Sequence, residues 1–352
     1  MSIKSTDDKL TINTDDHSSD TLTSIADSIT DLVTGTNIPA PIRKNALKAF
    51  NQLCIAAIDI PVAYLEGVAA EKRAESQSRI KIISTGGDQI AKQMDVNPEF
   101  AKVAVKKYGE KILREQVNLN SIAEIAASQL QKNTLSIEKD ATNANEIPEI
   151  NDDWLNSFEK EACLKSTDEM RQLFGRILAG EIRKPTSFSI KTIKLIAQLD
   201  SRVVNLFRIL CSLTVSLHVQ NHIHDARVVA IAGNANSNSL KIYGLSYDNL
   251  NTLHEYGLII PDYNSQMDYE ISIARQNNVD LPFHYQNKVW GLVSTTERPI
   301  VSNLALYGVA LSKSGSELLR IVDIEAAETY TLALNEYFKS RNLRMEEIDG
   351  TT

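Results

Sequence analysis

Three histidines lie close together in the sequence, at a spacing that could bind a metal ion: His218, His222 and His224. The first two are four residues apart, so on a helix both imidazole rings would lie on one face, as in many zinc sites. The stretch has no HExxH pattern and no neighbouring pair of cysteines, and we expect it to leave a helix and enter a loop. The sequence therefore favours histidines at a helix end and in a loop over a metal site.

A second candidate for chemistry is the charged group Glu169, Arg176 and Glu181, which could act as an acid or a charge relay. The sequence shows no carboxylate pair or nucleophile in an obvious catalytic arrangement around these residues, so we interpret them as scaffold. The sequence has no GxxxxGK[ST] phosphate loop and no GxSxG elbow, and its "STGGDQ" stretch follows an expected helix rather than a strand. These observations indicate no cofactor and favour a non-enzymatic protein.

Composition places the chain among globular proteins. It has 352 residues, enough for about two domains. The hydrophobic content is 43%, and the net charge of −8 gives no general attraction to nucleic acid. The three cysteines, Cys54, Cys163 and Cys211, are widely spaced and form no disulfide framework. With a polar, acidic amino terminus that is unlike a signal peptide, this pattern predicts a cytoplasmic protein.

Charge is distributed unevenly along the chain. Residues 1–37 contain 7 acidic and 2 basic side chains, whereas residues 38–132 contain 14 basic and 10 acidic ones. The basic region is typical of a solvated helical face, and it is also the only zone that could contact phosphates. The candidate residues for a nucleic-acid or partner surface are Arg73, Arg79, Lys81, Lys106 and Lys107.

One short apolar segment, residues 53–65, could touch a membrane. It is shorter than the ~20 residues of a membrane span, and Asp59 and Pro61 interrupt it. We interpret it as a buried helical segment, with a membrane-interface anchor as the alternative.

Helical spacing dominates the first half of the chain. We expect disorder over residues 1–19, followed within the acidic tail 1–37 by a short amphipathic helix whose apolar residues are Leu22, Ile25, Ile29, Leu32 and Val33. Long helices are predicted over 38–132, and a polar linker over 133–150.

Residues 151–217 read as four consecutive helices. Asp152 or Asp153 is expected to cap the first and Ser166 the second, with Glu169 completing a capping box. Further caps are expected at Ser187 or Ser189 and at Asp200 or Ser201, and the fourth helix is expected to run through residue 217.

In the last part, residues 218–352, the spacing of the apolar residues changes, with strand-like stretches among the helical ones. A helix over "LSYDNLNTLHEYG" is followed by "LIIPDYNSQMDYEISI", which reads as two strands around a turn and predicts a winged-helix-like unit. Further strands are expected at "KVWGLV", "LALYGVAL" and "LRMEEI", with a helix after Ser312 or Ser314. The expected fold is mainly α, with long N-terminal helices, a helical central domain and a small α+β C-terminal part.

Several of these stretches resemble the bacterial family called domain of unknown function 2806. They are "REQVNLNSIAEIA", the block from "DDWLN" to "IAQLD", "LNTLHEYGLI" and "GVALSKSGSELLRIV", where Ser312 replaces the Thr expected in the family. The hallmark residues, which we interpret as structural, are Trp154, Met170, Leu178, Ala179, Gly180, Glu181, Pro185, Ser189 and Thr192. The "ILAGE" block is also similar to the Abi-alpha group, which is named for abortive infection.

The resemblance implies no established activity and no catalytic residue, and it associates the chain with phage defence. The leading hypothesis is a non-enzymatic interaction protein in a bacterial phage or stress response. We expect a protein partner or self-association through helix faces. Two alternatives stay open: a nucleic-acid-binding regulator that uses the basic helices, and a membrane-associated effector that uses residues 53–65.

Overall fold

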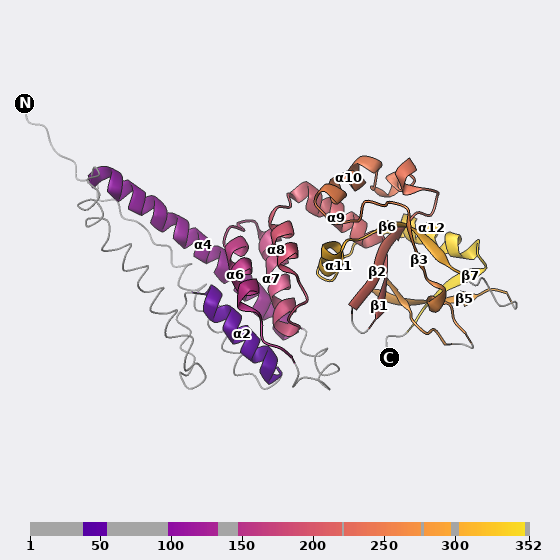
Figure 1. Cartoon of the computed structure of the whole chain (residues 1–352), viewed down its shortest axis with the longest axis horizontal. Helices are drawn as coiled ribbons and strands as arrows, with labels where there is room; N and C mark the ends of the chain where they lie inside the picture. Colours follow the sequence, from indigo (N-terminus) through magenta and orange to yellow (C-terminus); the bar gives the residue numbers. More distant parts are fainter. Residues whose placement is uncertain are drawn as a thin grey trace, which may run out of the picture. The chain divides into compact units, whose positions relative to one another are not determined.

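A computed structural model of the chain describes residues 38–54, 98–132, 147–219, 222–275, 278–296 and 303–348. The chain divides into two compact units, Met1–Pro185 and Thr186–Thr352. The described part of the first unit is helical, and that of the second combines helices with an antiparallel sheet (Figure 1).

The first unit contains four described helices: α2 (Ala40–Leu53), α4 (Pro98–Lys132), α6 (Asp152–Ala162) and α7 (Asp168–Arg183). Side chains cap two of them, because the first N–H groups of a helix need acceptors. Asn151 accepts from the N–H of Trp154 at the start of α6, and Thr167 accepts from the N–H of Met170 at the start of α7.

The core of the first unit lies where α7 packs on the second half of α4. A Cβ atom on Gly175 would lie 2.4 Å from Cγ2 of Ile125, so glycine allows the two helices to approach closely. Phe158 and Phe174 pack with ring centroids 5.5 Å apart and join α6 to the same core.

The second unit begins with helices and continues into the sheet. Its α-helices are α8 (Ile190–Ala197), α9 (Ser201–Leu213), α10 (Tyr247–Glu255), α11 (Lys313–Leu319) and α12 (Glu328–Lys339). Short 3-10 turns are η3 (Ala235–Ser237), η4 (Lys241–Tyr243) and η5 (Glu270–Ser272).

Seven described strands form one antiparallel sheet in the order β3-β6-β2-β1-β4-β5-β7. They are β1 (Thr214–Val219), β2 (His222–Val229), β3 (Ser265–Asp268), β4 (Phe283–Tyr285), β5 (Lys288–Ser294), β6 (Ala305–Ala310) and β7 (Leu343–Glu347). After β3, Ile273 forms a bridge with Leu292 of β5, and the N–H of Ala274 bonds to the Leu292 carbonyl at 2.7 Å. The sheet therefore curls back toward its other end.

Aromatic side chains of α12 fix this helix to the sheet. The Tyr330 hydroxyl donates to the carbonyl of Val229 at 3.0 Å, and Phe338 packs against Phe283 with ring centroids 6.1 Å apart. Both α12 residues are buried, so the C-terminal helix closes the core of the second unit.

The expectation of a mainly α fold with a small α+β end is wrong, because a seven-stranded antiparallel sheet dominates the second unit. The predicted fourth helix ends at Leu213, and Thr214–Val219 forms β1. The hairpin expected after α10 is also not formed. Ile259 pairs instead with Leu311 and β3 pairs with β6, so both partners come from much later in the chain.

The acidic tail 1–37 and residues 133–146 of the expected linker lie outside the described residues.

Candidate functional site

Helix α4 has two halves with opposite surroundings. From Leu119 onward its apolar side chains recur at helical spacing and are buried: Leu119, Ile122, Ala123, Ala126, Ala127 and Leu130. The half before Asn118 extends beyond the helices that pack on the second half (Figure 1). One continuous helix thus joins a buried anchor to a projecting arm.

Three apolar side chains share one side of this arm. Val103 is 64% exposed, Leu113 is 68% exposed and Val117 is 56% exposed. At 3.6 residues per turn, their directions fall within an arc of about 80°. We call these three residues the α4 face. Tyr108, also exposed, points to a different side of the helix.

Basic side chains flank the α4 face. Lys107, Lys111 and Arg114 are exposed and follow the apolar residues on one side of the helix. Acidic neighbours are interleaved with them: Lys111 lies 3.7 Å from Glu115, and the Arg114 side chain bonds to the carbonyl of Glu110. At 3.6 residues per turn the exposed Glu110 falls within the same arc, so the surface consists of three apolar side chains with charged side chains between and beside them.

Two amide side chains, the buried Asn118 and the partly buried Gln116, fasten the boundary between the two halves of α4. Asn118 donates to the carbonyl of Cys163 at 2.8 Å and accepts from Arg171 at 2.7 Å. Gln116 donates to the carbonyl of Leu53 at 2.9 Å, which ties α4 to the end of α2. Because unpaired buried polar groups are costly, these bonds fix the position of α4 relative to the segments that it contacts.

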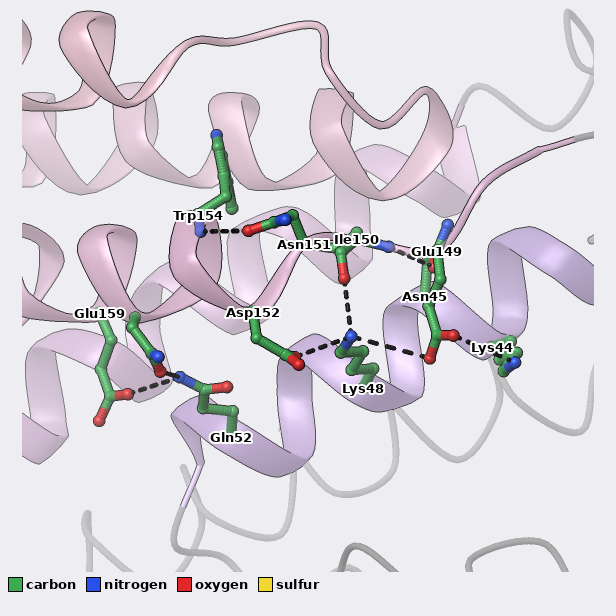
Figure 2. A network of polar contacts seen from close by, with 11 residues as sticks. Lys44, Asn45, Lys48, Gln52, Glu149, Ile150, Asn151, Asp152, Trp154 and Glu159 are labelled. Atoms are coloured by element: carbon green, nitrogen blue, oxygen red, sulfur yellow. Dashed lines mark hydrogen bonds and ion pairs between the residues drawn. The ribbon is translucent and has the colours of Figure 1, made fainter.

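A second polar network holds α2 against the chain that enters α6 (Figure 2). The buried Asn45 amide donates to the carbonyl of Pro148 at 3.0 Å and accepts from the N–H of Ile150 at 3.1 Å. Lys48 donates to the carbonyl of Ile150 at 2.7 Å and pairs with Asp152 at 2.8 Å. These contacts join segments about a hundred residues apart in sequence, so they are part of the scaffold that supports α4.

The same network continues along α2. Gln52 donates to Asn156 at 2.8 Å and to Glu159 at 2.9 Å, while Asn151 caps α6 (Figure 2). One side of α2 thus contacts both the entrance and the first two turns of α6.

The hallmark residues of the first unit lie in or beside its core. Trp154 is buried and stacks on Phe158 with ring centroids 5.1 Å apart. Buried residues are Leu178, Ala179, Glu181 and Pro185, whereas Met170 and Gly180 are partly buried. Glu169 and Glu181 lie twelve residues apart on α7, about 18 Å along the axis, so they cannot share a substrate atom.

The hallmark pair of the second unit binds a carboxylate at the start of α8. Glu317 Oε2 accepts from the Ser189 N–H at 2.8 Å, from the Ser189 hydroxyl at 3.1 Å and from the Thr192 hydroxyl at 2.6 Å. A carboxylate is favourable at a helix N-terminus, where N–H groups are unpaired. This contact joins α8 to α11.

Two further family-like stretches meet in the second unit. The Ser312 hydroxyl donates to the carbonyl of Gly257 at 2.6 Å, and its N–H bonds to the carbonyl of Leu258 at 2.9 Å. A Cβ atom on Gly315 would lie 2.1 Å from that Leu258 carbonyl oxygen. "LNTLHEYGLI" and "GVALSKSGSELLRIV" are therefore two sides of one packing contact.

The histidines expected at a helix end lie on strands. His218 on β1 stacks on His284 of β4 with ring centroids 3.9 Å apart, and its Nε2 lies 3.0 Å from the Ser216 hydroxyl. Burial, then His284 and Arg320, lower the pKa of His218 to about 4. His222 and His224 are exposed on β2, and the described residues contain no cluster of three or more metal-ligating side chains.

Sequence reasoning missed a buried ion pair. Arg227 and Asp225 lie two apart on β2, so they face the same side, and their side chains meet at 2.7 Å. The Tyr269 hydroxyl donates to Asp225 at 2.9 Å, and Arg227 also donates to the carbonyls of Ser265 and Leu306. The alternation of Asp and Arg in an apolar strand was the available signal.

The thiols are poor nucleophiles. Burial raises the pKa of Cys54 to about 12 and raises that of Cys211, and burial with nearby carboxylates raises that of Cys163.

Much of the predicted basic surface lies outside the described residues, namely Arg73, Arg79 and Lys81. Lys106 belongs to α4 but its side chain is not described, and Lys107 is exposed. Of the segment 53–65, Leu53 and Cys54 are described and both are buried. No helix in the described ranges is long and apolar enough to cross a bilayer.

A family model described as "Protein of unknown function (DUF2806)" matches residues 104–335, a span that starts on the projecting half of α4 and ends within α12. No curated protein and no solved structure matches the chain.

Proposed function

The chain belongs to the DUF2806 family, and we propose that it is a non-enzymatic interaction protein that binds a protein partner through the α4 face. The observation that carries this proposal is the exposure of Val103, Leu113 and Val117 on one side of a helix whose other half is firmly anchored. Large apolar side chains exposed along one side of an anchored helix favour an interaction site. An amphipathic helix face supports helix-to-helix or helix-in-groove binding.

The non-enzymatic part of the proposal is supported by how reactive side chains are used in the described residues. Glu317 caps α8, Asp225 neutralises Arg227, and burial suppresses the thiolate forms of Cys54 and Cys211. Each of these groups satisfies a structural need of its own unit.

A nucleic-acid partner is the second candidate, and the observation that favours it is the row Lys107, Lys111 and Arg114 beside the α4 face. It has less support, because Glu110 and Glu115 interrupt the row and a phosphate surface needs an excess of cations. Affinity for DNA or RNA that falls steeply with salt would favour this candidate over a protein partner.

The test uses the full chain with Leu113→Glu and Val117→Glu, purified with its bound proteins from cells that make it. Leu332→Glu is the matched control, because Leu332 is 69% exposed on α12 and resembles Leu113 in size and exposure. We expect a partner protein to be lost from the α4 variant and retained by the control. Equal recovery from both variants would contradict the proposal.

We further propose that this binding serves phage defence or a related stress response in the cytoplasm, as the family resemblance suggests. The test is the plating efficiency of a phage panel on cells that express the full chain, the α4 variant or an empty vector. Protection that needs Leu113 and Val117 supports the role, and plating that is unchanged across the panel contradicts it.

A further inference from the structure

Two imidazole rings lie in contact where β1 pairs with β4 in the second unit. Ser216 of β1 lies opposite His284 of β4, and His218 follows two residues after Ser216, so the three side chains share one face of the sheet. The rings of His218 and His284 are nearly parallel, with an interplanar angle of 19° and centroids 3.9 Å apart. Both residues are partly buried. Strand pairing therefore holds two titratable groups together at the protein surface.

Most ring nitrogens of this pair are not used in hydrogen bonds. Nε2 of His218 lies 3.0 Å from the Ser216 hydroxyl. Within the described part of the chain, no hydrogen bond involves Nδ1 of His218 or either nitrogen of His284. These three nitrogens also keep some contact with solvent. They are consequently accessible to a ligand.

The electrostatic surroundings of the pair are cationic. Arg320, exposed at the end of α11, lies close enough to His218 to disfavour a proton on that ring, and α11 packs against β2 beside β1. Burial, then His284 and Arg320, lower the pKa of His218, and burial lowers the pKa of His284. Among the described residues, no carboxylate forms an ion pair with either ring. A proton taken up by the pair would therefore need a negative charge from outside.

The parallel arrangement of the rings argues against a metal ion as that ligand. Each imidazole directs a nitrogen lone pair within its own ring plane, so two nearly parallel rings do not aim their lone pairs at one ion. An oxyanion has no such restriction, because its several oxygens can accept from donors that lie side by side. Two parallel N–H groups of one arginine bind a carboxylate in this way.

We propose that His218, His284 and Arg320 form a binding site for a phosphate-type oxyanion, with the Ser216 hydroxyl orienting His218. The anion supplies the negative charge that the pair lacks, and each protonated ring donates an N–H to it. Binding and protonation are linked, because the anion favours the charged rings and the charged rings bind the anion more tightly. This site belongs to the second unit and does not involve the α4 face.

The test is calorimetric titration of the full chain with sulfate, whose own charge does not change in neutral or mildly acidic solution. We expect the affinity to rise as pH falls from about 8 to 6, by up to about tenfold per pH unit for each proton taken up. In NMR titrations of the histidine rings, sulfate should raise the pKa of His218 and His284 and leave that of the exposed His222 unchanged. Titrations with inorganic phosphate and with methyl phosphate then distinguish a site for the free anion from a site for a phosphate ester.

Two substitutions and two matched controls locate the binding site. His284→Gln and Arg320→Gln should each weaken sulfate binding by at least about tenfold, because each removes a charge-assisted hydrogen bond. His222→Gln and Arg202→Gln, at other exposed positions of the second unit, should leave the affinity unchanged. The inference is overturned if the wild type binds no sulfate at the acid end of this pH range, if its affinity does not depend on pH, or if the controls weaken binding as much as the site variants.

Discussion

Thr192 donates a 2.6 Å hydrogen bond to a carboxylate oxygen of Glu317, a residue 125 positions later in the chain. The N–H and hydroxyl of Ser189 donate to the same oxygen. An anion-binding helix N-terminus is thus filled by the protein's own glutamate. The Ser-x-x-Thr pattern of α8 consequently has a structural explanation.

Replacing Thr192 by Val should destabilise the second unit by about 1–3 kcal/mol, because Glu317 loses its shortest donor while remaining partly buried. The measurement is chemical denaturation of the full chain. Thr252→Val is the control, since the Thr252 hydroxyl bonds only to a carbonyl one turn earlier on α10. Equal losses for both variants would show that the Glu317 contact has no special role.

Replacing Gly315 by Ala should severely destabilise or prevent folding, because the new Cβ would lie 2.1 Å from the Leu258 carbonyl oxygen and backbone must shift. Gly109→Ala on α4 is the matched control, because no atom of the described residues lies within 4 Å of the place that its Cβ would take. In that helix alanine should be neutral or stabilise by up to about 1 kcal/mol. Soluble yield and melting temperature of the two variants distinguish these outcomes.

Replacing Arg227 by Met should cost about 3–5 kcal/mol, because Asp225 would remain buried without its cation. Adding Asp225→Asn should recover part of that loss, since the uncompensated charge is then removed. Denaturation midpoints of the single and double variants provide the comparison. A double variant that is no more stable than the single one would contradict this electrostatic explanation.

Acid should destabilise the second unit through His218. Its pKa in the folded chain is lowered from 6.5 to about 4, chiefly by burial, so the folded ring resists protonation. As pH falls from 6.5 toward 4, the unfolded chain takes up the proton first, and stability that is present above pH 6.5 is progressively lost. His218→Gln should reduce this dependence of melting temperature on pH.

The N-terminal caps of several helices could be predicted from the sequence. For three helices the sequence narrows the cap to one of two residues, and one of each pair, Ser189, Asp200 or Ser312, accepts a hydrogen bond from an N–H of the first turn. The caps of α6 and α7 are Asn151 and Thr167 rather than their neighbours. Where adjacent residues have equivalent oxygens, propensity alone cannot choose between them.

Long-range pairing could not be predicted in the same way. No Gly or Pro interrupts the stretch 201–217, whose apolar residues follow a helical period up to Leu213 and an alternating period after it, so the change from α9 to β1 at Thr214 has no local turn signal. Strand β6 pairs with β2 and β3 rather than with a neighbour in sequence, and His284 reaches His218 only through the β1–β4 pairing. Such contacts depend on the order of strands in the sheet.

The α4 face depends both on a local helical pattern, which the sequence shows, and on long-range packing, which it does not show. The sequence predicts long helices within residues 38–132, and helix α4 occupies Pro98–Lys132 of that range. Which half is buried depends on α2, α6 and α7, whose contacts begin near Gln116 and Asn118. Exposure of Leu113 and Val117 is therefore a consequence of tertiary packing.

The most direct measurement of the central claim is photo-cross-linking in living cells from a reactive residue placed at Leu113, compared with the same residue at Leu332. Both side chains are similarly exposed, at 68% and 69%. We predict a discrete adduct from position 113 that protease removes and nuclease does not, and no matching adduct from position 332. The absence of an adduct at 113, equal adducts at both positions, or a nuclease-sensitive adduct would contradict the claim that the α4 face binds protein.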